Sequence, residues 1–86
     1  MPTVQDFEAR ANCIDREINS RLKPQSSLSD LAETATIICS QDIWNKMRQH
    51  VTDREGFHEM EDLIQQDRLS TQQKAFEDAM EARSSR

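Results

Sequence analysis

The sequence predicts an all-α protein, a small bundle of three to four helices. Its 86 residues include one glycine and two prolines, so few residues are present that tight turns between strands require. No segment alternates apolar and polar residues for long enough to indicate a β-strand. Residue types with high helix propensity, namely Ala, Glu, Gln, Arg, Leu and Met, dominate the chain.

The first helix is predicted over residues 4–22. Thr3 and Asp6 have the spacing of a capping box, in which each side chain bonds the backbone of the other at the helix start. Pro24 ends the helix, because proline forces the preceding residue out of the α conformation. The apolar residues recur every three or four positions and form one stripe: Val4, Phe7, Ala11, Ile14, Ile18 and Leu22.

Two pairs of opposite charge are expected on the solvent-exposed side of this helix. Asp6 precedes Arg10 by one helical turn, and Glu17 precedes Arg21 by the same spacing. Each pair in this acid-first order stabilises a helix by about 0.3 kcal/mol.

A polar connector over residues 23–29 leads to the second helix, which Ser27 or Ser29 can cap. Its apolar residues do not fall on one line: Leu28, Leu31, Ala35, Ile38, Ile43, Trp44, Met47 and Val51. Two interpretations fit this pattern. Either one helix is apolar on two sides and touches two neighbours, or the helix bends near Ser40, which could cap a new one. We favour the single helix with two neighbours.

A break between helices is predicted within residues 51–56. Thr52 and Glu55 form a second capping box and indicate a helix start, whereas Gly56 indicates a nearby helix end. The third helix is expected to end near Arg68, and its apolar residues are Phe57, Met60, Leu63 and Ile64.

A short fourth helix is predicted after Ser70, because residues 70–73 have the pattern of a further cap. Its apolar residues are Ala75, Phe76, Ala79 and Met80. Two alternatives stay open: this segment merges with the third helix, or it forms a loose tail. The chain is short enough for one domain, expected over residues 1–82 and followed by a frayed tail over residues 83–86.

The composition favours a protein partner over nucleic acid. The net charge is −5, and acidic side chains outnumber basic ones in both halves of the chain, so a phosphate backbone would be repelled. An acidic surface suits a basic or apolar protein surface, although acidity also serves solubility alone. Apolar residues make up 35% of the chain, below the usual share of about 45–50%. A homodimer or a partner would supply the buried surface that so small a core lacks.

Cys13 and Cys39 are the two cysteines, and each lies among apolar helical positions. Free cysteine behaves there as a small apolar side chain, so we expect two reduced thiols. The N-terminus shows no secretory signal, and no apolar run is long enough to cross a membrane. These features predict a cytoplasmic protein without membrane contact.

No arrangement of residues indicates catalysis. A single glycine excludes the glycine-rich loops that cradle phosphates. His58 and Glu59 begin a zinc-protease pattern, but Asp62 stands where the second histidine belongs. Cys13, Cys39 and the two histidines lack the close pairing typical of zinc sites. We therefore expect no metal, no cofactor and no enzyme.

Trp44 has two interpretations. It is either the largest core side chain or the anchor of a partner-binding patch, because tryptophan and arginine dominate binding hot spots. The patch would consist of Ile37, Trp44, Met47, Arg48 and Val51. The leading functional hypothesis is a protein-binding module such as an inhibitor, an adaptor or a chaperone. The alternative is a regulator that acts on nucleic acid, or on an enzyme of nucleic acid, through Lys46, Arg48 and Arg54.

Overall fold

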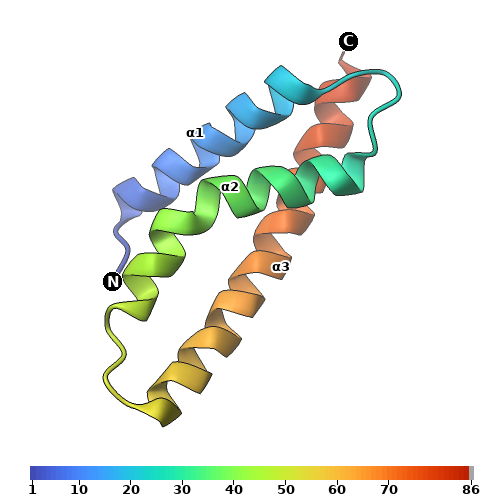
Figure 1. Cartoon of the computed structure of the whole chain (residues 1–86). Coiled ribbons are helices and arrows are strands. Elements are labelled where there is room, and N and C mark those ends of the chain that lie inside the picture. The colour runs from blue at the N-terminus through green and yellow to red at the C-terminus, as the bar shows by residue number, and fades with distance from the viewer. Residues whose placement is uncertain (86) are drawn as a thin grey trace.

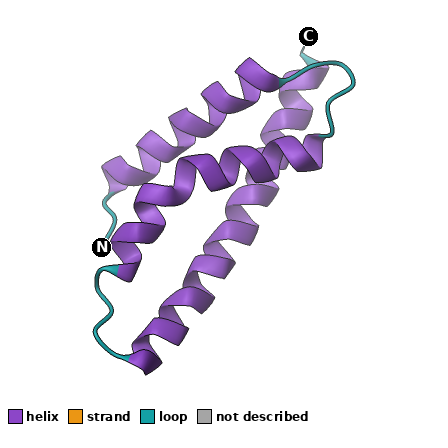
Figure 2. Ribbon diagram, in the orientation of Figure 1, coloured by secondary structure: helices purple, strands orange, loops and turns teal. Residues whose placement is uncertain are grey.

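The computed structural model describes residues 1–85 and contains three helices: α1 (Val4–Arg21), α2 (Leu28–Arg48) and α3 (Arg54–Ser84). Helices α1 and α2 run antiparallel side by side, and the longer α3 crosses behind α2 (Figure 1). The described residues form helices and loops without a strand (Figure 2), which confirms the all-α prediction of three to four helices. No helix among residues 1–85 combines the length and apolar character of a membrane span.

The predicted starts of α1 and α2 are confirmed. Thr3 and Asp6 form the capping box: the Asp6 N–H donates to Thr3 Oγ1 at 3.2 Å, and the Thr3 N–H donates to Asp6 Oδ2 at 2.8 Å. Ser27 caps α2 by accepting from the Asp30 N–H. Helix α1 ends at Arg21, with Leu22 as its extended cap, directly before the connector that contains Pro24.

Helix α2 is unbroken and packs against both other helices, as favoured from its two apolar sides. It does not restart at Ser40. That side chain is fully buried and its hydroxyl accepts a hydrogen bond from Arg10 Nη1 at 3.3 Å. The apolar pattern that changes face along α2 therefore reflects contact with α1 on one side and with α3 on the other.

Helix α3 is also continuous, so the predicted end near Arg68 and the separate fourth helix are wrong. The hydroxyls of Ser70 and Thr71 bond Asp67 in the preceding turn, at 3.2 Å and 3.4 Å, instead of capping a new helix. Ile64 before this point and Ala75 after it are both buried. Because both parts pack within the bundle and neither glycine nor proline intervenes, the helix is not interrupted.

The start of α3 resolves the two conflicting signals in residues 51–56. Asp53, and not Thr52, is the cap: its Oδ1 accepts from the Gly56 N–H at 2.6 Å. Gly56 therefore lies in the first turn of α3 and does not end a helix. At the other end the helix reaches Ser84, so residues 83 and 84 of the expected tail are helical. Arg83 Nη1 donates to the Ser26 carbonyl at 3.1 Å, and residue 86 lies outside the described residues.

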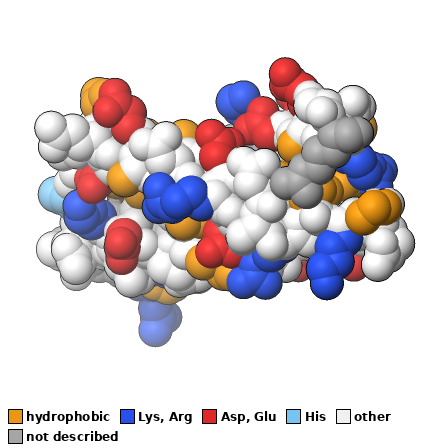
Figure 3. All heavy atoms as spheres, turned by 90° about the horizontal axis from the view of Figure 1, so that it is seen from above, with side chains coloured by type: hydrophobic (Ala, Val, Ile, Leu, Met, Phe, Trp, Pro, Cys, Tyr) orange, Lys and Arg blue, Asp and Glu red, His pale blue; other side chains and the backbone are white. Residues whose placement is uncertain are grey.

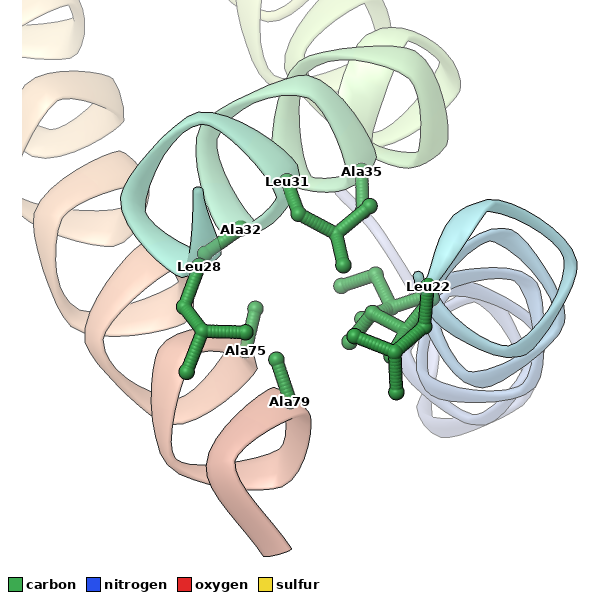
Figure 4. Close-up of a cluster of buried hydrophobic side chains, with 9 residues drawn as sticks. Leu22, Leu28, Leu31, Ala32, Ala35, Ala75 and Ala79 are labelled. Atoms are coloured by element: carbon green, nitrogen blue, oxygen red, sulfur yellow. The ribbon is translucent and has the colours of Figure 1, made fainter. Parts of the chain in front are cut away.

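The core has two parts. The first lies where all three helices meet (Figure 4) and contains Ile14, Ile18, Leu22, Leu28, Leu31, Ala32, Ala35, Ala75 and Ala79. Its alanines let the helices approach closely, because a methyl side chain holds the backbones apart less than a larger side chain does. The second part joins the C-terminal half of α2 to the N-terminal half of α3 and contains Ile43, Trp44, Met47 and Ile64.

Cys13 and Cys39 form a disulfide, so the expectation of two reduced thiols is wrong in this structure. The antiparallel packing of α1 and α2 brings the two Cα atoms to 5.7 Å, within the range that a disulfide spans. Both residues are partly exposed. Sequence spacing alone could not reveal this pairing, because it depends on how the two helices are set against each other.

Candidate functional site

The structure does not place the five residues of the predicted patch on one open surface. Trp44 and Met47 are buried in the second core cluster, with exposed fractions of 6% and 9%. Ile37, Arg48 and Val51 are partly exposed. Of the two interpretations of Trp44, the structure shows the core side chain, so this residue does not offer its ring to a partner.

Two of the three residues in the predicted basic face are held by carboxylates. Lys46 Nζ lies 2.7 Å from Asp6 Oδ1, and Arg48 contacts both oxygens of Glu61, at 2.7 Å and 3.3 Å. Hydrogen bonds from these two cations hold the pKa values of Asp6 and Glu61 below their usual range. Arg54 is exposed in the first turn of α3. On the face shown in Figure 3, basic and acidic side chains are intermingled without a stripe of positive charge.

A polar network that the sequence did not predict joins the three helices. Arg10 of α1 binds both carboxylate oxygens of Asp67 of α3, with Nη1–Oδ2 at 2.6 Å and Nη2–Oδ1 at 3.0 Å. The Trp44 indole N–H donates to Asp67 Oδ2 at 2.9 Å. Arg10 and Asp67 are mostly buried, with exposed side-chain fractions of 10% and 21%. The expected Asp6–Arg10 pair is therefore wrong, whereas the expected Glu17–Arg21 pair is present at 2.6 Å.

Asp67 remains ionised within this network. Partial burial by itself would raise the pKa of its carboxyl group. Hydrogen bonds from Arg10 and Trp44 to the carboxylate outweigh burial and hold the pKa below the usual value. A carboxylate engaged by several donors is a poor proton acceptor, so the network serves to hold the helices together and not to move protons.

The sequence did contain a weak signal for this network. Arg10 stands between Phe7 and Ile14 at helical spacing, on the apolar side of α1. Asp67 similarly follows Ile64 on the buried side of α3. A charged residue at a core-facing position needs a partner of opposite charge, but the sequence did not show which one lay within reach.

A groove of about 660 Å³ lies between α1 and α3, and we call it the α1–α3 groove. Ala11, Ile14 and Ala75 supply apolar surface, while Arg10 and Asp67 join its two sides. On α3 its lining residues run from Asp67 to Asp78. This stretch is about 16 Å along the helix axis, or roughly three turns.

The charges in this groove leave a negative excess. Its remaining charged residues are Asp15 of α1 and the pair Lys74–Asp78 of α3, which lie 3.4 Å apart. Since Arg10 and Lys74 are each paired with an acid, Asp15 is left without a cation among the described residues. Two further exposed acids, Glu8 and Glu81, lie seven residues from Asp15 and Lys74 respectively and so continue the same helix faces.

The apolar stripe of α1 divides into a covered half and an exposed half. Ile14, Ile18 and Leu22 are buried, whereas Val4 is 73% exposed and Phe7 is 43% exposed. The ring of Phe7 lies 5.2 Å from the guanidinium of Arg10, at the edge of the groove. The apolar face of α1 is therefore buried toward the C-terminus of the helix and exposed to solvent toward its N-terminus, beside the groove.

Helix α3 also contributes an exposed apolar side chain on the face that lines the groove. Leu63 is 49% exposed and lies seven residues before Ser70, which lines the groove, so both belong to the same face of α3. The exposed apolar side chains of α1 and α3 thus extend the surface of the α1–α3 groove toward the starts of both helices.

Among residues 1–85, no three His, Cys, Asp or Glu side chains form a cluster that could hold a metal ion. Comparison with models of known families, with characterised proteins and with solved structures found no match for this chain. The candidate site is therefore the α1–α3 groove, identified from its geometry alone.

Proposed function

We propose that this protein is a non-enzymatic module that binds another protein and covers part of its surface. The observation that carries the proposal is the exposed half of the α1 stripe beside the α1–α3 groove. Val4 and Phe7 continue the stripe that buries Ile14 and Ile18 in the core, yet Val4 is 73% and Phe7 43% exposed among the described residues. Apolar side chains that continue a core stripe into solvent, next to a groove, are candidates for an interaction site.

The chemistry of the groove supports binding over catalysis. Arg10 and Asp67 neutralise each other, as do Lys74 and Asp78. A catalytic acid or base must lie within hydrogen-bond reach of the substrate. Its pKa must also be close to the pH at which the enzyme works. Asp67 has the opposite character, because its hydrogen bonds hold the ionised form and lower its pKa.

An inhibitor, an adaptor and a chaperone would each use such a surface, and the identity of the partner decides among them. Self-association of two copies is the competing use of the same surface, and the net charge of −5 on each copy opposes it. The mass in solution, measured by light scattering, separates a homodimer from a monomer that awaits another protein.

The cytoplasmic location remains a prediction of the sequence. Cytoplasmic reductants would hold Cys13 and Cys39 as thiols, whereas the structure joins them. The fraction of the disulfide in protein taken from its native cells, trapped by rapid alkylation, tests the location directly.

Purification from native cells tests the binding function. Tagged wild type should retain one protein in fixed proportion, and Phe7→Ser should lose it, because the substitution removes exposed apolar surface without opening the core. Leu69→Ser is the matched control, since Leu69 is 59% exposed on α3 and does not line the α1–α3 groove. Failure to retain any protein in fixed proportion, with the tag at either terminus, contradicts the proposed function.

A further inference from the structure

We infer that the partner presents a cationic amphipathic helix and that this helix lies in the α1–α3 groove. This inference rests on the proposed protein-binding function and adds the place and the chemistry of the bound segment. A small molecule and a second copy of this chain are the competing occupants.

The shape of the groove suits a helix. Helices α1 and α3 both pack against α2 and form the two walls of the groove. A fourth helix laid between them would complete a four-helix arrangement, in which each helix packs against two neighbours. The lining on α3 extends over about three helical turns, which matches the apolar face of a short amphipathic helix.

The surface of the groove suits an amphipathic occupant. Ala11 and Ala75 are small, so a helix can approach the walls closely. Beyond them, Phe7 of α1 and Leu63 of α3 are available for larger apolar side chains of the occupant. Binding by the apolar face of a helix in a groove is a recurrent mode of peptide recognition.

The charges select a basic occupant. Asp15 lies in the lining without a cation, and the exposed acids Glu8 and Glu81 continue the faces of α1 and α3 that border the groove. The two basic lining residues, Arg10 and Lys74, are already paired. A second copy of this chain, whose net charge is −5, is disfavoured by the same acids, whereas lysines or arginines on the rim of a bound helix would be attracted.

Three designed peptides of about 18 residues, or five turns, test the inference. The first has leucine and alanine on one face and lysine on the other. The second carries glutamate in place of lysine, and the third has the composition of the first in scrambled order. Each is titrated into the full-length, isotope-labelled, disulfide-bonded protein while the backbone amide resonances are recorded.

The cationic amphipathic peptide should shift the amides of Ala11, Asp15, Ser70 and Lys74. It should bind about tenfold more tightly than the anionic and scrambled peptides, because neither of these combines an apolar face with basic flanks. Asp15→Lys should weaken its binding about fivefold. The matched reversal Asp62→Lys alters an exposed acid of α3 outside the groove lining and should change the affinity less than about twofold.

Several results overturn the inference. Equal binding of the scrambled peptide shows attraction to charge without a groove. Equal binding of the anionic peptide removes the electrostatic argument. Shifts confined to the outer face of α3, or equal losses from Asp15→Lys and Asp62→Lys, place the contact elsewhere.

The native partner separates this inference from the proposed function. If wild type retains a partner that Asp15→Lys retains equally well, the groove assignment fails while the binding function stands. If no partner is retained at all, both fail.

Discussion

Arg10 and Asp67, which are 57 residues apart in the sequence, form a two-point ion pair between α1 and α3. The same guanidinium donates to Ser40, and the same carboxylate accepts from Trp44, so both residues also bind α2. The Asp67 carboxylate of α3 accepts hydrogen bonds from α1 and from α2. It therefore helps to fix the relative positions of the three helices. This arrangement also defines the position of the α1–α3 groove, which both residues line.

Asp67→Asn should destabilise the protein by about 2–3 kcal/mol. The substitution removes the negative charge and leaves Arg10 mostly buried without its counter-ion. Urea unfolding at neutral pH measures the loss. Asp78→Asn is the control, because the Lys74–Asp78 pair is more exposed and such pairs contribute less than about 1 kcal/mol. Equal losses of unfolding free energy from the two substitutions would show that the Arg10–Asp67 pair stabilises the protein no more than the exposed Lys74–Asp78 pair does.

Stability should fall in acid, and Asp67 should account for part of the fall. Its pKa in the folded protein lies below 3.8, the usual value for an aspartate side chain, so the folded state binds this proton less readily than the unfolded chain does. The stabilisation is therefore complete well above pH 3.8 and is lost as the pH falls through the lower, folded-state pKa. Unfolding free energies from pH 7 downward should show a shallower decline for Asp67→Asn than for wild type.

Thr36→Val should leave stability unchanged or raise it by about 1 kcal/mol. Thr36 is fully buried, and its hydroxyl has no hydrogen-bond partner among residues 1–85. Valine replaces this hydroxyl with a methyl group of similar size, so the cost of burying an unpaired polar group is removed. Ser40→Ala is the contrasting substitution, because the buried Ser40 hydroxyl accepts from Arg10. That change should cost about 1 kcal/mol. Thermal unfolding of both variants provides the measurement, and a clear loss for Thr36→Val contradicts the assignment.

Reduction of the disulfide should destabilise the protein by about 3 kcal/mol. Cys13 and Cys39 are separated by 26 residues, and closing a loop of this size lowers the chain entropy of the unfolded state. Urea unfolding with and without a thiol reductant measures the difference. The double substitution Cys13→Ser and Cys39→Ser should behave like the reduced protein and should not respond to reductant. If wild type is likewise indifferent to reductant, the bridge does not contribute to stability.

Gly56→Ala should bring less stability than alanine usually brings to a helix. Replacing glycine within a helix normally gains about 1 kcal/mol. Here the new Cβ would lie 2.7 Å from Asp53 Oδ1, which accepts the Gly56 N–H and caps α3. Displacing that cap costs about 1 kcal/mol, so the two effects should nearly cancel. In the background of Asp53→Ala the full gain should return, and a double-mutant cycle of unfolding free energies measures the coupling.

Local signals in the sequence predict the helical character of the chain and the starts of α1 and α2. Thr3 and Ser27 cap α1 and α2, because a side-chain oxygen next to free backbone N–H groups acts within one turn of chain. The two apolar sides of α2 likewise indicated that this helix packs against two neighbours. Local signals failed at Ser70, where packing on both sides of the residue carried α3 through a segment that resembles a cap.

The pairings between helices follow from how the three helices pack. Arg10 binds Asp67 instead of the nearby Asp6, Cys13 joins Cys39, and Trp44 lies in the core instead of on a binding surface. Each of these three contacts depends on the distances and crossing angles between packed helices. The residue pattern within one helix does not contain this information. The α1–α3 groove has the same origin: the sequence placed Val4 and Phe7 on an apolar stripe, but the packing of three helices decided which half of that stripe stays exposed.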